Sequence, residues 1–160
     1  MSTRLIDIDE ILDLRYEILT KAEKRLAIVD DIFAKISIEQ RIREEIIPEL
    51  RKYEAKYWQL LSQEAHSHVI AELNARNAIT EVVRELEMIE KKPSMNYPDE
   101  FMRLLLEIRD KLNESGKPAA AKVKLALPLI PGILSYEVEL DTESSLRRAF
   151  QLIRRLFKGH

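Results

Sequence analysis

The stretch that decides the fold runs from residue 48 to residue 90 and reads PELRKYEAKYWQLLSQEAHSHVIAELNARNAITEVVRELEMIE. After its first residue it contains neither proline nor glycine, and its apolar residues recur at steps of three and four, the spacing of one helix face. This apolar seam consists of Leu50, Tyr53, Tyr57, Leu60, Leu61, Ala65, Val69, Ala75, Ala78, Val82, Leu86 and Ile89. An unbroken helix of this length would measure roughly 60 Å, more than one small domain spans. We therefore expect either a bend near Asn74 to Asn77 or a helix that projects to meet another chain, which would make the protein a homo-oligomer.

Two helices are predicted ahead of this stretch. Asp7 and Glu10 have the spacing of a capping box, and apolar residues follow at helical spacing as far as residue 36. Ser37 and Gln40 repeat the capping signal. The chain is therefore expected to turn at that point and to begin its second helix.

Prolines divide the remaining helical part of the chain. Pro48 has no backbone N–H to donate, so a kink or a new helix start is expected over residues 46–49. Residues 91–98 contain two prolines and are predicted to form a loop. Asp99 then begins a further helix, which is expected to end near Asn113.

The pattern changes after Gly116 from helical to alternating. Lys122, Lys124 and Ala126 alternate with Val123, Leu125 and Leu127, and Ser135, Glu137, Glu139 and Asp141 alternate with Tyr136, Val138 and Leu140. With Pro131-Gly132 between them, these runs predict a short β-hairpin. A last helix is expected to bury Leu146, Ala149, Phe150, Ile153, Leu156 and Phe157. Of these, Phe150, Ile153 and Phe157 are expected to pack on Val123, Leu125, Tyr136 or Val138 of the hairpin.

The predicted fold class is therefore mainly α. Residues 1–116 are expected to form an antiparallel helical bundle with one long helix. Residues 117–160 are expected to add the β-hairpin and the closing amphipathic helix, packed on the bundle.

Composition and charge restrict the classes of function. The 160 residues are 46% hydrophobic and 34% charged, without cysteine, which excludes disulfide scaffolds and thiolate metal sites. No apolar run approaches the roughly 20 residues that span a bilayer, so we expect a soluble, cytoplasmic protein. The net charge of −2 argues against nucleic acid as a partner. Residues 117–160 hold eight basic and four acidic residues, which gives +4 there and −6 for the first 116 residues.

Known catalytic motifs are missing from the sequence. Glu64, His68 and Glu72 follow each other at four-residue steps, which on one helix would place two carboxylates and an imidazole on the same face, as in a metal-binding bundle. A second helix with matching ligands is lacking, so solvated helix surface is the preferred interpretation and a metal-dependent bundle enzyme is the less favoured alternative. We expect a protein that is not an enzyme and that has no cofactor.

Aromatic and basic clusters offer candidate binding surfaces. Tyr53, Tyr57 and Trp58 could stack on a ligand, but at helical spacing beside leucines they are expected to be core. On the last helix Arg147, Arg148, Arg154 and Arg155 are expected to form two patches that point away from the core and bind an acidic protein surface. A membrane surface is the alternative partner, in which case the protein would be a membrane-acting helical effector.

One C-terminal segment resembles a known type of module. Residues 122–143 read KVKLALPLIPGILSYEVELDTE, and an amphipathic helix follows them. This segment resembles the small effector-associated or adaptor regions of bacterial, often cyanobacterial, STAND NTPases and caspase-like proteins of signalling and conflict systems. The resemblance implies a recruiting or adaptor module in signalling or defence, whose partner would be an NTPase or protease encoded nearby.

Overall fold

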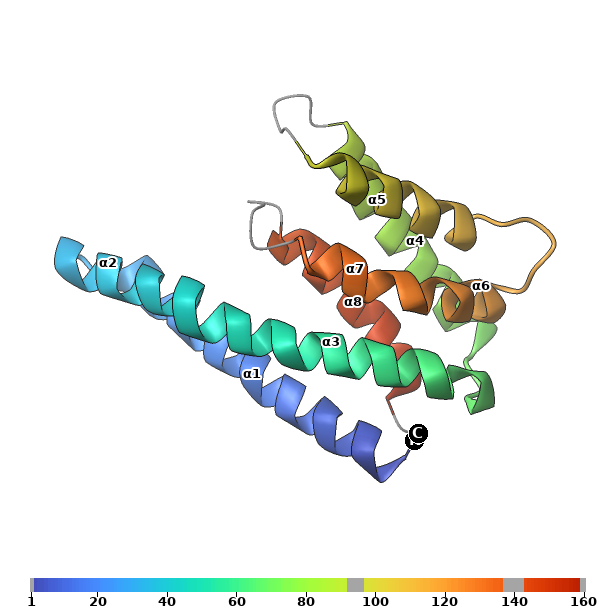
Figure 1. Ribbon diagram of the computed structural model, residues 1–160, viewed down its shortest axis with the longest axis horizontal. Coiled ribbons are helices and arrows are strands. Elements are labelled where there is room, and N and C mark those ends of the chain that lie inside the picture. The colour runs from blue at the N-terminus through green and yellow to red at the C-terminus, as the bar shows by residue number, and fades with distance from the viewer. Residues whose placement is uncertain (1, 92–96, 137–142, 159–160) are drawn as a thin grey trace. The chain divides into compact units, whose positions relative to one another are not determined.

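The computed structural model describes residues 2–91, 97–136 and 143–158, and every regular element within these ranges is helical (Figure 1). The α-helices are α1 (Thr3–Ile28), α2 (Ile32–Arg41), α3 (Ile47–Glu64), α4 (Glu72–Glu90), α5 (Asp99–Leu112), α6 (Ala119–Ala126), α7 (Ile130–Leu134) and α8 (Glu143–Phe157). A π-helical segment, η1 (Ile42–Ile46), and two 3₁₀ turns, η2 (Ala65–Ser67) and η3 (Leu127–Leu129), connect some of them. The mainly helical class is thus confirmed, and the β-hairpin is wrong.

Contacts divide the chain into two compact units, residues 1–57 and residues 58–160, and each is described by itself. The division expected between residues 116 and 117 stays a prediction. On either side of it, α5 and α6 pack against each other within the second unit.

The first unit is a helical hairpin, in which α1 lies antiparallel to α2 and the following part of α3 (Figure 1). α1 begins earlier than predicted, because the Ser2 hydroxyl accepts a hydrogen bond from the Leu5 N–H at 3.2 Å. The turn also comes earlier, because the Asp31 carboxylate caps α2 by accepting from the Phe33 N–H at 3.3 Å. The expected turn at Ser37 is therefore wrong, since Ser37 lies inside α2.

The new helix start expected over residues 46–49 is confirmed, because the π-helical segment η1 ends at Ile46 and α3 begins at Ile47. An α-helical Pro48 would have donated to the carbonyl of Glu44, and it has no N–H to do so. The wider turn of η1 carries the chain past this missing bond, and Pro48 lies in the first turn of α3, where no donor is needed.

The aromatic cluster of α3 belongs to the core, as predicted. The side chains of Tyr57 and Trp58 are completely buried. Tyr53 is half-buried, with the guanidinium of Arg15 5.4 Å from its ring centre. Nearby in the first unit, Tyr16 donates a 2.5 Å hydrogen bond to the buried carboxylate of Glu54.

The long helix predicted over residues 48–90 is two helices. The break lies at residues 65–71, and the bend expected at Asn74 to Asn77 is wrong because both asparagines lie inside α4. Histidine, serine and valine, which fill residues 66–69, are weak helix formers, and the Ser67 hydroxyl donates to the Glu64 carbonyl at 2.9 Å. The α4 half of the seam is confirmed, since Ala75, Ala78, Val82, Leu86 and Ile89 are all buried.

The region of the expected first strand forms α6, η3 and α7. Pro118 precedes a run of three alanines that starts α6, and Pro128 and Pro131 lie in the first turns of η3 and α7, where their missing N–H groups are not needed. The buried residues follow helical spacing: Ala119, Val123, Ala126, Leu127, Ile130, Ile133 and Leu134. Of the expected second strand, Ser135 ends α7, Tyr136 lies in a turn, and residues 137–141 lie outside the described residues.

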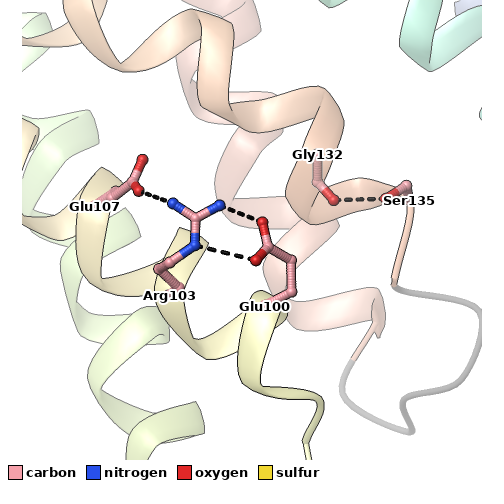
Figure 2. A network of polar contacts seen from close by, with 5 residues as sticks. All are labelled: Glu100, Arg103, Glu107, Gly132 and Ser135. Atoms are coloured by element: carbon pink, nitrogen blue, oxygen red, sulfur yellow. Dashed lines mark hydrogen bonds and ion pairs between the residues drawn. The ribbon is translucent and has the colours of Figure 1, made fainter.

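α5 begins and ends as predicted, with Asp99 in its first turn and Asn113 as its C-cap. Arg103 on its surface binds two carboxylates of the same helix, Glu100 and Glu107 (Figure 2). α7 packs closely on α5 at Gly132. The contact is so close that a Cβ atom added at Gly132 would lie only 3.2 Å from Cδ1 of Leu104.

α8 is the closing amphipathic helix that the sequence predicts, but its main neighbour is α4 and not a hairpin. The ring of Phe150 meets Trp58 edge-on at 6.4 Å. The ring of Phe157 meets His68 edge-on at 5.8 Å. The predicted burial of its apolar face is therefore confirmed, against different partners.

Candidate functional site

The four arginines of α8 fall into two pairs with different surroundings. Arg147 and Arg154 are 6% and 3% exposed, so the expectation that they point away from the core is wrong. Arg154 donates a 3.0 Å hydrogen bond to the side-chain oxygen of Gln151. Arg148 and Arg155 are exposed. This second pair lies seven residues apart on one side of the helix, where a partner can reach it from solvent.

The exposed pair borders a groove between α4 and α8. One hollow of about 290 Å³ is lined by Ile70, Ala71, Asn74, Asn77, Ala78, Glu81, Leu152, Arg155 and Leu156. A second hollow of about 420 Å³ shares Glu81, Leu152 and Arg155 with the first and adds Glu85, Arg148, Ala149 and Gln151. The two hollows therefore form one continuous surface, which we call the α4–α8 groove.

Small side chains on α4 create the space for this groove. Ala78 on α4 and Ala71 just before it line the first hollow, where larger side chains would have filled the gap toward Leu152. Leu152 is half-buried, so its apolar surface forms part of the lining and still faces the opening. The groove thus has an apolar floor between two helices of fixed geometry.

Charge is distributed unevenly around the groove. On the α4 side, Glu81 and Glu85 line the groove, and the ion pair of Glu81 with Arg84 of the same helix at 3.1 Å offsets part of this negative charge. On the α8 side, the guanidinium of Arg155 is exposed and forms no ion pair with any of the described residues. An incoming carboxylate can therefore bind Arg155 without first displacing a charged partner.

The candidate metal ligands Glu64, His68 and Glu72 do not share a helix face. Glu64 ends α3, His68 lies in the connection and Glu72 begins α4, so the helical spacing on which that idea rests is interrupted. Within the described ranges, no three histidine or acidic side chains are grouped so that they could hold a metal ion.

Glu72 and His68 form contacts that join the start of α4 to α6. The Glu72 carboxylate accepts hydrogen bonds from the backbone N–H groups of Ala119 at 2.8 Å and Ala120 at 3.1 Å, so it caps the first turn of α6. These two bonds hold the pKa of Glu72 below its usual value. Burial against its surroundings lowers the pKa of His68, and the backbone carbonyl of His68 accepts from the Lys124 ammonium at 2.5 Å. Together these contacts tie the start of α4 to α6.

The sequence pattern identifies the arginines but misses the α4 wall of the groove. It places Asn74 and Asn77 at a bend and leaves Ile70 out of the apolar seam. The signal that is present is the run of alanines at positions 71, 75 and 78, whose spacing places small side chains on adjoining parts of one helix face.

Comparison with known proteins adds no relative. The chain matches no family model, no curated protein and no solved structure. None of the described helices is both long enough and apolar enough to cross a membrane.

Proposed function

We propose that this chain is a non-catalytic protein-interaction module whose α4–α8 groove binds an acidic, amphipathic segment of a partner protein. The observation that carries the proposal is the exposed Arg155 guanidinium beside an apolar floor that includes Leu152 and Ala78. Such a pairing of apolar floor and charged rim is typical of grooves that receive a helix through a few anchor side chains.

The dimensions of the groove favour a side-chain anchor over a whole small ligand. The first hollow, at about 290 Å³, lies just below the range for small-molecule pockets, which is about 300–1,000 Å³. It is suited to one or two apolar side chains of a partner helix. The second hollow extends the surface along α8 to Arg148, so a helix of two turns would reach both arginines.

The charges favour a partner with carboxylates next to its anchors. Arg155 and Arg148 are separated by two helical turns, and a partner helix with acidic residues about seven positions apart would match that spacing. Recruitment to a bacterial signalling or defence protein, with an NTPase or protease as the partner, is what the C-terminal resemblance implies, and it stays a prediction.

A peptide selection tests the proposal even though the natural partner is unidentified. The full chain is used to select binders from a displayed library of random helical peptides, and the selected peptides are measured by fluorescence anisotropy. We expect peptides that combine apolar anchors with acidic residues, and an affinity at least about tenfold weaker for Arg155→Glu.

The matched control is Lys111→Glu, which makes the same charge change at an exposed position of α5. Leu152→Glu should abolish binding by placing a charge on the apolar floor. Peptides that bind Arg155→Glu and Leu152→Glu as tightly as the original chain would refute the proposal.

A further inference from the structure

The turn between α1 and α2 carries a second exposed apolar surface, in the first unit. Ile28 ends α1 and is 80% exposed, while Ile32, Phe33 and Ile36 in the first turns of α2 are 63%, 78% and 54% exposed. We call these four side chains the tip patch. They are held together by the short connection at residues 29–31 and by the Asp31 cap of α2.

The patch is not needed for the packing of its own hairpin. α1 buries Leu5, Ile8, Leu12 and Leu19, and α2 buries Ile38. Phe33 and Ile36 are three residues apart on the side of α2 away from Ile38, so they form a second apolar face. A large aromatic and three isoleucines in contact with water are unfavourable unless another surface covers them.

The charges around the tip patch indicate what covers it. Residues 21–40 contain four basic and four acidic side chains, so this segment has no net charge. Neither an anionic membrane nor a strongly acidic partner would be attracted to it. A second copy of the chain would be attracted to it. In a two-fold arrangement, Asp30 and Asp31 at the turn of one copy can face Lys24 and Lys35 of the other copy.

The area agrees with this partner. The exposed fractions of the four side chains add up to almost three fully exposed residues. At 150–200 Å² for each residue, the patch exposes roughly 500 Å² of surface per copy. Two copies would bury roughly 1,000 Å² from these side chains alone, and the flanking polar residues would add to it. That total reaches the lower limit for a specific protein–protein interface.

We propose that two copies of the chain associate through their tip patches about a two-fold axis. This interface takes the place of the one expected from helix length, which depended on an unbroken helix of 43 residues that the break between α3 and α4 removes. The tip patch belongs to the first unit and the α4–α8 groove to the second, and the two surfaces share no residue.

Sedimentation equilibrium of the full chain tests the proposal directly. At about 100 µM we expect the mass of a dimer, and for the double variant Ile28→Glu with Phe33→Glu the mass of a monomer, with unchanged helical circular dichroism. The matched control is Val69→Glu with Leu73→Glu, which introduces the same charges at two other exposed apolar positions and should leave the dimer intact.

Spin labels locate the interface. The chain has no cysteine, so Ser37→Cys beside the patch and Ala55→Cys far along α3 each provide a single, exposed labelling site. We expect a shorter distance between the two copies' labels at position 37 than at position 55. A monomeric original chain, a dimer that survives the glutamate double variant, or a shorter distance at position 55 would each overturn the proposal.

Discussion

The same substitution should destabilise the fold strongly at Arg154 and hardly at all at its neighbour Arg155. Arg154 is 3% exposed and donates to Gln151, whereas Arg155 faces the α4–α8 groove and solvent. Arg154→Glu would place a carboxylate in a site almost without water and would remove that hydrogen bond. Breaking a buried charged interaction costs about 3–5 kcal/mol, a large part of the 5–15 kcal/mol by which a domain is stable.

Arg155→Glu should change the free energy of unfolding by no more than about 0.5 kcal/mol, because it exchanges one solvated charge for another. Urea denaturation of the full chain, followed by circular dichroism at 222 nm, measures both variants under the same conditions.

Arg154→Met provides a second measurement in case Arg154→Glu does not fold. Methionine keeps an apolar stem of similar length and removes the guanidinium with its charged hydrogen bond to Gln151, so its cost should be about 1.5–3 kcal/mol, less than that of Arg154→Glu. Equal, small losses for Arg154→Glu and Arg155→Glu would refute the burial of Arg154. A large loss for Arg155→Glu would show that Arg155 is structural and would remove it from the proposed binding site.

Three further predictions concern packing and pH. Phe150→Ala should lower the free energy of unfolding by about 3–5 kcal/mol, because the ring is buried against Trp58; an unchanged melting temperature would place α8 in solvent. The pKa of Glu72 is depressed in the folded protein, so its contribution to stability is present above the ordinary carboxyl value of 4.5 and is lost as the pH falls below it. Glu72→Gln should therefore weaken the pH dependence of the melting temperature between about pH 5 and pH 3. An unaltered dependence would contradict the cap on α6. Burial lowers the pKa of His68, so the folded state binds fewer protons than the unfolded state and loses stability as the pH falls through the ordinary value of 6.5. His68→Phe should remove that loss of stability between about pH 7 and pH 5. If the loss persists in the variant, another group causes it.

Local patterns predicted most helices but not the C-terminal region. The seam of α4 and the acidic start of α5 can be predicted because helix periodicity and end charges act over a few residues. The strand predicted around Val123 is wrong because an alternating pattern of only six residues is too short to exclude a helix. Positions 123, 126, 127 and 130 satisfy helical spacing equally well, and the three alanines before them favour it.

The site was predictable only in part, for a different reason. The sequence separates apolar from basic residues on α8, which identifies Arg148 and Arg155 as surface cations. It gives Arg147 and Arg154 the same description, although they are buried, because the depth of a residue at the border of an apolar face depends on how other parts of the fold pack around it. The groove itself requires α4 and α8 to be neighbours, and residues 70–81 and 148–156 are too far apart in sequence for a local pattern to show it.

The most direct test of the account is where an acidic, amphipathic peptide binds. Such a peptide, taken from the selection on the full chain, is titrated into the ¹⁵N-labelled protein, and the shifts of the backbone amide signals are followed. The account predicts that the largest shifts occur at Ala78, Leu152 and Arg155, and that they weaken as salt is added because the screening length falls to about 3 Å at 1 M. Shifts concentrated at Ile32 and Phe33, or spread without salt dependence over α5 and α6, would contradict it.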